Sequence, residues 1–420
     1  MAQDMKLSEE LTWRGFVNQT TYKDLNVLDG APITFYWGVD PSADSMTIGN
    51  LAAAMMVKRF IKHGHKPVLL VGGATGMIGD PDGKSEERAL KSEDEIDKNK
   101  QSIVAQYKQI FGEHGFEIVD NYDWFKGIGY LEFLREVGKH VPMRQMLGRE
   151  FVQSRLSEDG NGISYAEFSY SLIQGYDFLH LFRENGVTLQ VCGADQWGNS
   201  IAGVELIRRI EGKEANVYSA PLVVNKVTGQ KFGKSEDGAI WLDGTKTSPT
   251  QFYQFWINVD DEGAESYLKI FTELSKEEIE RTLDEHKKDP QRRVAQMVLA
   301  QHVTGLVHGK ENMMFAETIT EYLTGKEKIS GIDVSAIKEL KDNIPSAVTR
   351  SDGSIVDVLV STGLAISNTE ARRLLNDNAI SINNSKVTRE NFESSDFNNK
   401  VLLIRRGKAF KDSALVELEQ

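Results

Sequence analysis

The sequence is poor in the features that mark secreted and membrane proteins. Its 420 residues contain one cysteine, Cys192, so a scaffold held by intrachain disulfides is excluded. No apolar run is long enough to span a bilayer as a helix. The first residues, Met1 to Glu10, are polar and lack the apolar core of a signal peptide. We therefore expect a cytoplasmic protein with no membrane partner.

Positive charge is also scarce, since 49 Lys and Arg face 62 Asp and Glu, for a net charge of −13. An acidic chain is a poor general binder of phosphate backbones. The segment from Ser351 to Gln420 differs, because nine basic residues face ten acidic ones there. This nearly neutral segment could still present a local basic face.

Strand and helix patterns alternate in the first part of the chain. Residues 33–37 and 67–71 have the β-branched and aromatic character of short buried strands, and 49–62 between them has a helical pattern. Strand, helix, strand over this length indicates a parallel βαβ unit. Further strands are predicted at 187–193 and 217–225, with helices at 165–184 and 198–211. We predict one α/β domain with a Rossmann-like parallel sheet over 1–247.

The pattern changes after Thr247. Residues 248–325 predict a helical domain, and 326–352 predict a linker. A small α+β module is predicted over 353–420. Its helix should begin at Ser367 or Asn368, and the following short strand should end in an Asn-Ser turn.

The charged stretch 84–110 predicts a solvated helix or a mobile insertion.

Two loops carry candidate phosphate sites. Residues 36–50 join the first strand to the first helix, and α/β folds bind ligands at such a loop because the helix N-terminus attracts anions. Residues 231–235, with the sequence KFGKS, form a polar loop whose lysines are flexible point charges suited to a polyphosphate. Taken alone, the first segment is equally consistent with an ordinary strand–helix loop, and the second with a charged turn.

Together these motifs resemble a known family. DPSADSMTIGN at 40–50 and KFGKS at 231–235 are similar to the HIGH and KMSKS signatures of class I aminoacyl-tRNA synthetases. Between them, GADQWGN at 193–199 resembles the tyrosyl-tRNA synthetase branch of bacterial type. With 71–88 and 169–177, the resemblance covers essentially the whole chain. It implies activation of L-tyrosine by ATP, with Mg²⁺ accompanying ATP and no metal held tightly by the protein, and transfer of tyrosine to tRNA(Tyr) by a homodimer.

The resemblance implies roles at the phosphate end of the site. No general base is needed, because the attacking carboxylate is already ionised at neutral pH, so catalysis should rest on positioning and charge stabilisation. The implied catalytic residues are Thr47, Asn50, Lys231, Lys234 and Ser235, assisted by Lys84 and Arg88. The implied ATP-binding residues are Asp40, Ser42, Thr47, Gly49, Asn50, Gly193, Asp195, Gln196, Phe232, Gly233 and Lys234.

A polar stripe marks the amino-acid end. Tyr170, Gln174 and Asp177 share one helix face, which either faces solvent or lines a polar pocket. The resemblance implies the pocket, with Tyr36 and Asp177 on the substrate phenol. Such contacts reject phenylalanine, and this family is itself the usual example of that discrimination. The implied tyrosine-binding residues are Tyr36, Gly38, Asp80, Tyr170, Gln174, Asp177 and Gln190, of which Asp80, Tyr170 and Gln174 would hold the ammonium group.

The C-terminal module resembles the small RNA-binding module of ribosomal proteins and pseudouridine synthases. Its stretches at 367–375 and 380–387 carry this resemblance. The implied RNA-binding residues are Arg372, Arg373, Lys386, Arg405 and Arg406. For any single one of them, a solvated surface charge is nearly as good an explanation.

Two alternatives remain at this stage. The first signature has Thr47 and Asn50 where the family usually has histidine, and the loss could weaken transition-state stabilisation by about 1–3 kcal/mol. A non-catalytic RNA-binding paralogue is therefore one alternative. The other is an NAD(P)-dependent oxidoreductase, because GATGMIG at 73–79 also resembles a dinucleotide fingerprint. The following Asp80-Pro81-Asp82-Gly83 opposes it, since that sequence breaks the helix the fingerprint needs.

Overall fold

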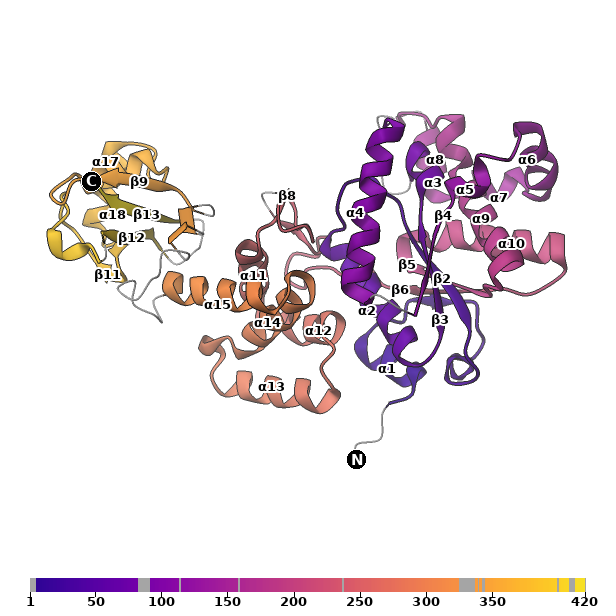
Figure 1. Cartoon of the computed structure of the whole chain (residues 1–420), viewed down its shortest axis with the longest axis horizontal. Helices are drawn as coiled ribbons and strands as arrows, with labels where there is room; N and C mark the ends of the chain where they lie inside the picture. Colours follow the sequence, from indigo (N-terminus) through magenta and orange to yellow (C-terminus); the bar gives the residue numbers. More distant parts are fainter. Residues whose placement is uncertain are drawn as a thin grey trace. The chain divides into compact units, whose positions relative to one another are not determined.

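The computed structural model describes ten segments of the chain, residues 5–81, 91–112, 115–157, 159–235, 238–324, 337–338, 340–341, 344–398, 400–407 and 412–419. The chain forms two compact units (Figure 1). The first contains Met1–Lys246 and Asp260–Ala295, and the second contains Thr247–Val259 and Gln296–Gln420. The division into 1–247, 248–325, 326–352 and 353–420 stays a prediction.

A six-stranded sheet forms the centre of the first unit, in the order β1-β6-β5-β2-β3-β4. Every neighbouring pair is parallel except β1 with β6, which confirms the predicted α/β fold with a Rossmann-like parallel sheet. The strand predicted at 217–225 is shorter than expected, because Pro221 has no N–H to continue the ladder. The strands are β1 (Gln19–Thr20), β2 (Thr34–Val39), β3 (Lys66–Val71), β4 (Glu117–Asp120), β5 (Leu189–Gly193) and β6 (Asn216–Ala220).

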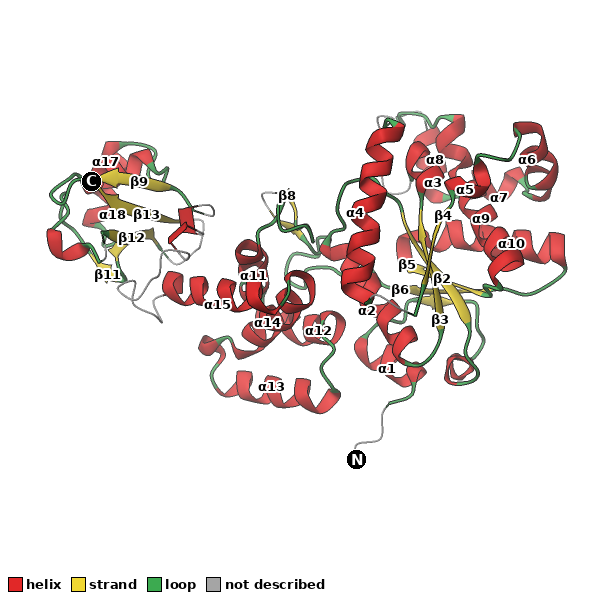
Figure 2. Ribbon diagram, viewed as in Figure 1, coloured by secondary structure: helices red, strands yellow, loops and turns green. Residues whose placement is uncertain are grey.

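Helices cover both faces of this sheet, and strand β2 shows how (Figure 2). Side chains alternate between the faces of a strand. Phe35 packs on Phe60 of α2 (Ile48–Lys62), and Trp37 packs on Tyr107 of α4 (Glu93–Phe111). Tyr36 points to the opposite face and packs on Phe178 of α9 (Tyr165–Asn185). The sheet therefore separates α2 and α4 from α9.

Helix α10 (Trp197–Glu211) packs closely along α9. Gly203 makes this approach possible, because a Cβ there would lie 2.7 Å from the Cβ of Phe178. Within the predicted solvated segment 84–110, residues 93–110 belong to α4, and the prediction is wrong for one face of this helix, which buries Ile96, Ile103 and Ile110. The shorter helices of the region are α1 (Leu7–Arg14), α3 (Gly73–Ile78), α5 (Tyr122–Phe125), α6 (Tyr130–Glu136), α7 (Met143–Leu147) and α8 (Glu150–Leu156).

Two further helices, α12 (Asp261–Phe271) and α13 (Lys276–Lys288), belong to the first unit. Buried arginines hold the C-terminal end of α12. Arg14 donates to the carbonyl oxygens of Lys269 and Leu274 at 2.7 Å each, and Arg59 of α2 donates to that of Thr272 at 2.8 Å. Guanidinium groups donate hydrogen bonds to the last carbonyl groups of a helix and interact favourably with its dipole. The C-terminal part of α2 is therefore fixed, while its N-terminus faces the candidate site.

In the second unit, α11 (Pro249–Ile257), α14 (Val294–His308) and α15 (Lys310–Thr324) are followed by a five-stranded sheet in the order β11-β10-β12-β13-β9. Ser367 caps the predicted helix by accepting from the N–H of Glu370. The turn after β10 consists of Asn383 and Asn384, both at positive φ, so the predicted Asn-Ser turn is wrong by one residue. The remaining elements are β9 (Ser346–Thr349), α17 (Ile355–Ser361), α18 (Asn368–Asn376), β10 (Ile380–Ile382), β11 (Ser385–Lys386), β12 (Val401–Arg406) and β13 (Ser413–Leu418). None of the helices in the described segments is long and apolar enough to cross a membrane.

Candidate active site

The first signature turns from the carboxyl end of β2 into the N-terminus of α2. The backbone N–H and the hydroxyl of Thr47 both donate to Oδ1 of Asn50, at 2.9 and 3.1 Å. Because Oδ1 faces Thr47, the Nδ2 group of Asn50 is the donor that the side chain can offer elsewhere. Thr47 thus orients Asn50 at a helix N-terminus, where anions are favoured.

Backbone hydrogen bonds join the two signatures directly. The N–H of Ile48 donates to the carbonyl of Ile240 at 3.2 Å, and the N–H of Ile240 donates to the carbonyl of Gly233 at 2.9 Å. Gly233 has a φ of 85°, which favours glycine, and a Cβ there would lie 3.2 Å from Cβ of Ile48. The KFGKS loop continues as a hairpin of β7 (Lys234–Ser235) and β8 (Gly238–Ala239). The two signatures therefore form one surface. Lys84 and Arg88 lie outside the described residues.

A cavity of about 100 Å³ adjoins this surface. Three of the residues assigned to ATP, Gly49, Gly193 and Phe232, line it, together with Lys231, which was assigned to catalysis. The ring of Phe232 stacks on Tyr267 of α12, with centroids 4.3 Å apart. This stack fixes part of the KFGKS loop on a helix that is itself held by buried arginines. Ser42 and Asp195 are exposed near the same edge.

The floor of the amino-acid end is a buried carboxylate. Asp177 of α9 is 1% exposed and accepts from Nδ2 of Asn121 at 3.1 Å and from Nε1 of Trp124 at 3.0 Å. Burial raises the pKa of Asp177 well above its usual value, although these two hydrogen bonds oppose the shift. Burial, and then the charge of Asp177, also raise the pKa of Tyr36. The Tyr36 phenol therefore stays protonated at neutral pH.

Three buried side-chain oxygens at this end have no hydrogen-bond partner among the described residues. They are the hydroxyl of Tyr36 and the amide oxygens of Gln174 and Gln190. An unsatisfied buried polar atom costs about 1–3 kcal/mol, and such atoms are rare in native proteins. All three atoms belong to residues assigned to tyrosine binding. Their lack of partners fits a site in which a polar ligand supplies the missing hydrogen bonds.

A line of hydrogen bonds connects the two ends. Asp40 accepts from the hydroxyl of Tyr170 at 2.7 Å and from that of Thr75 at 2.6 Å. Asn121 then donates to Oγ1 of Thr75 at 3.0 Å as well as to Asp177. Asp40, which was assigned to ATP, is thus linked through two side chains to the floor of the amino-acid end.

Asp80 and Gln196 also lie together, because Nε2 of Gln196 donates to Oδ2 of Asp80 at 2.6 Å. The sequence assigned Asp80 to tyrosine and Gln196 to ATP, so the structure joins two residues that the motifs treated separately.

Gly38 is exposed on β2, and a Cβ there would lie 3.2 Å from Cδ2 of Leu70.

Sequence reasoning missed Thr75, Asn121 and Trp124. The available signal was positional, because Thr75 follows β3 and Asn121 follows β4 at the edge where Asp40 follows β2. The carboxyl ends of parallel strands meet at one edge, where ligands bind. Each strand end was therefore a candidate, whether or not a known motif marked it.

The glycine-rich segment 72–79 serves packing. A Cβ at Gly72 would lie 2.2 Å from Oδ1 of Asp40, and a Cβ at Gly73 would lie 2.2 Å from Oδ1 of Asp120. The N–H groups of Gly73 and Ala74 at the start of α3 donate to side chains, to Asp120 at 3.1 Å and to Asn121 at 2.7 Å. The anion site that a dinucleotide fingerprint needs is thus already filled.

The five basic residues assigned to RNA have different surroundings. Arg372, Arg373 and Lys386 are exposed. Arg405 is 7% exposed and donates to Oδ1 of Asn384 at 3.2 Å, and burial lowers its pKa. Arg406 pairs with Asp412 at 3.0 Å.

Within the described segments, no group of three His, Cys, Asp or Glu side chains could hold a metal ion.

Comparisons with known proteins agree with the resemblance. The family model "tRNA synthetases class I (W and Y)" matches residues 28–324, and the "Tyrosine--tRNA ligase SYY-like C-terminal domain" model matches residues 336–411. The chain is 44% identical over 412 residues to the tyrosine–tRNA ligase of Staphylococcus haemolyticus, covering 96% of this chain and 97% of the relative. It is also 44% identical over 413 residues to that of Pediococcus pentosaceus, covering 96% and 98%.

A solved structure gives the same result. A C-terminally truncated mitochondrial tyrosyl-tRNA synthetase of Aspergillus nidulans superposes with a TM-score of 0.69 at 30% identity. The match covers 77% of this chain and 95% of that structure. The chain therefore belongs to the tyrosine–tRNA ligases, within the class I tRNA synthetases.

Proposed function

We propose that this chain attaches L-tyrosine to tRNA(Tyr) in two steps. In the first, a tyrosine carboxylate oxygen bonds to the α-phosphorus of ATP, and the bond to pyrophosphate breaks. In the second, a hydroxyl of the tRNA 3′ end bonds to the tyrosyl carbonyl carbon, and AMP leaves with the bonding electron pair. The observation that carries the proposal is the junction of the two signatures beside a buried amino-acid pocket with unpaired oxygens.

The pocket residues select tyrosine in this proposal. Tyr36 and Asp177 face the substrate phenol, and Asp80, Tyr170 and Gln174 hold the ammonium group. Gly38 and Gln190 complete the walls. A phenylalanine ring would leave the buried Tyr36 hydroxyl and Asp177 carboxylate without the substrate hydroxyl, which is unfavourable.

The phosphate-end residues stabilise the charge that moves from the α-phosphate to pyrophosphate. Thr47 and Asn50 act at the N-terminus of α2, and Lys231, Lys234 and Ser235 act from the KFGKS loop. Lys84 and Arg88 assist, Mg²⁺ accompanies the ATP phosphates, and no metal is bound tightly by protein ligands. The residues proposed to line the ATP site are Asp40, Ser42, Gly49, Gly193, Asp195, Gln196, Phe232 and Gly233.

The C-terminal module is proposed to bind the tRNA. Arg372, Arg373 and Lys386 carry most of this contact, because their side chains are exposed. Arg405 and Arg406 act mainly through the fold, since Arg405 is buried and Arg406 is less exposed than Arg372 or Arg373. Replacing Arg372, Arg373 and Lys386 with alanine should raise the KM for tRNA without changing tyrosine activation. An unchanged KM would remove this assignment.

A homodimer is proposed through helices α6 to α9 of the first unit. Large apolar side chains are exposed there, and a groove of about 440 Å³ runs between four of them. Exposed apolar patches of this kind mark interfaces, and a two-fold contact between copies would bury the same patch on both. The exposed residues are Tyr130, Leu131, Met143, Leu147, Leu156 and Tyr165.

Sedimentation would test the dimer. Leu131→Glu with Met143→Glu should shift the chain from dimer to monomer, while Ile366→Glu, a change at the 90%-exposed Ile366 of the C-terminal module, should not. A wild-type monomer would refute the proposal.

A cytoplasmic location is proposed as well, because the buried free thiol of Cys192 suits a reducing compartment.

Tyrosine-dependent exchange of pyrophosphate into ATP tests the central proposal. Exchange is expected with tyrosine and not with phenylalanine or tryptophan. It would also show that Thr47 serves where the family usually has histidine. Folded protein that gives no exchange with any of the three amino acids would overturn the proposed activity.

A further inference from the structure

A chain of side-chain hydrogen bonds leads from a surface arginine to Asp80. Arg149, the residue before α8, donates from Nη1 to Oδ1 of Asn199 at 2.6 Å and from Nη2 to the carbonyl of Gly198 at 2.7 Å. Nδ2 of Asn199 donates to Oε1 of Gln196 at 3.2 Å, and Nε2 of Gln196 donates to Oδ2 of Asp80 at 2.6 Å. Three bonds thus connect Arg149 to Asp80.

The donor-to-acceptor direction of these three hydrogen bonds is fixed at both ends. A guanidinium group only donates hydrogen bonds, and an ionised carboxylate only accepts them. Arg149 therefore turns the oxygen of Asn199 toward itself, which leaves the Asn199 NH₂ group to face Gln196. Gln196 then turns its oxygen to Asn199 and its own NH₂ group to Asp80. Each amide has one orientation that satisfies both neighbours.

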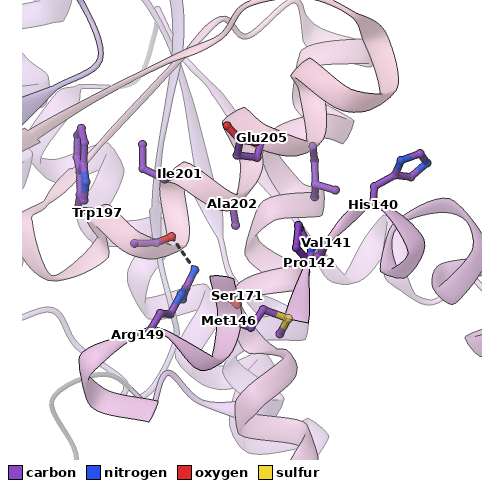
Figure 3. Close-up of a pocket in the computed structure, with 12 residues that line it drawn as sticks. His140, Val141, Pro142, Met146, Arg149, Ser171, Trp197, Ile201, Ala202 and Glu205 are labelled. Atoms are coloured by element: carbon purple, nitrogen blue, oxygen red, sulfur yellow. Dashed lines mark hydrogen bonds between the residues drawn. The ribbon is translucent and has the colours of Figure 1, made fainter. Parts of the chain in front are cut away.

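The surroundings make the guanidinium hard to replace. Asn199 is 4% exposed, so its amide oxygen has little access to bulk water. Arg149 borders a cavity of about 240 Å³ that Met146, Trp197 and Ile201 also line, and its side chain spans from the start of α8 to the first turn of α10 (Figure 3). A shorter or apolar side chain would leave the Asn199 oxygen without this donor, and an amide flip there would propagate to Gln196.

We propose that Arg149 is a positioning residue for the substrate ammonium group, acting through Asn199 and Gln196 on Asp80. The inference rests on the proposed function, in which Asp80 holds that group. If the Gln196 amide turned its oxygen toward Asp80, two acceptors would face each other. The carboxylate would then move away from Gln196, and it would lose its complementarity to a cation.

The test compares tyrosine with its analogue lacking the ammonium group, 3-(4-hydroxyphenyl)propanoate. In Arg149→Met, the Kd for tyrosine should rise about tenfold, whereas the analogue should bind as it does to the wild type. Arg149→Lys should recover most of the tyrosine affinity, because an ammonium group still donates to the Asn199 oxygen. Arg208→Met, at an arginine exposed on α10 and paired with Glu205, is the matched control and should bind both compounds normally.

Binding is measured by calorimetry on the full-length chain, with thermal unfolding to confirm folded variants. Equal weakening of tyrosine and the analogue in Arg149→Met would overturn the proposal, because it would show a general loss of pocket structure. Unchanged tyrosine affinity would overturn it too. If Arg149→Met fails to fold, Arg149→Lys decides: the proposal then requires a small loss for tyrosine and none for the analogue. Failure of the wild type to bind tyrosine would instead count against the proposed function itself.

Discussion

The two ends of the proposed site are built in different ways. At the amino-acid end, buried side chains hold one another, as where Asp177 accepts from Asn121 and Trp124. At the phosphate end, backbone contacts align the two signatures, and the lysines come from a loop that turns at Gly233. A neutral ring with one hydroxyl must be recognised by complementary shape and hydrogen bonds, which requires rigid and buried groups. A polyphosphate is attracted by charge and backbone N–H groups, which tolerate exposure.

The comparison predicts that the largest loss follows a change at the amino-acid end. Asp177→Ala should raise the Kd for tyrosine at least about 100-fold, because it removes an acceptor for the substrate phenol and leaves two buried donors unpaired. Equilibrium dialysis with labelled tyrosine measures the effect. Asp123→Ala, at an exposed carboxylate of α5, is the control. Normal tyrosine binding by Asp177→Ala would show that the pocket is assigned wrongly.

A change at the phosphate end should separate binding from chemistry. Lys234→Ala should leave tyrosine binding unchanged and slow tyrosyl-adenylate formation about 100-fold, the usual size for losing one charge-stabilising donor. Single-turnover kinetics measure the rate, and Lys226→Ala, at an exposed lysine of the preceding loop, is the control. A loss of tyrosine affinity in Lys234→Ala would mean that the two ends are not separable as described.

The pH dependence of tyrosine binding should come from the amino-acid end. The pKa of Asp177 lies well above its usual value because of burial. The substrate phenol would be a third donor to this carboxyl group and would favour its ionised form, so binding should release a proton. Below the pKa of Asp177 in the free protein, the Kd should rise by up to about tenfold per pH unit as the pH falls.

Calorimetric titrations between about pH 5 and pH 8 would reveal this linkage, since the tyrosine carboxylate and ammonium groups keep their charges there. Asp177→Asn should bind more weakly and lose the dependence. A wild-type profile with no slope over this range would contradict the proposed linkage.

The smallest effect is expected at Thr47. Thr47→Val removes the hydroxyl bond to Asn50 but keeps the backbone N–H bond to the same oxygen. Adenylate formation should slow about three- to tenfold, as for one hydrogen bond of modest net worth, and tyrosine binding should not change. A loss above about 100-fold would indicate that the hydroxyl itself stabilises the reacting phosphates.

Much of this architecture could be predicted from local sequence. The βαβ unit around 33–71 follows from hydrophobic runs and strand residues, because both depend on neighbours along the chain. The helix start at Ser367 follows from its capping chemistry, which also lies within four residues. The family membership was carried by short strings such as GADQWGN, whose order along the chain could be read directly.

The network around Asp177 could not be predicted in the same way. Asn121 and Trp124 are more than fifty positions from Asp177 in the chain, and no spacing rule joins them. The turn at Asn383-Asn384 was misplaced because its register depends on how β10 pairs with β11. Arg405 was grouped with surface charges, since only the packing of the module shows that it is buried.

The sequence by itself determined the fold class and the family, because these depend on local patterns and on motifs read in order. The tertiary structure alone decided which polar groups meet. It linked Asp40 to Asp177 through Thr75 and Asn121, and Arg149 to Asp80 through two amides. The reason is physical: a buried hydrogen bond depends on distances and orientations set by the whole sheet and its helices, which residues distant in the chain reach only after folding.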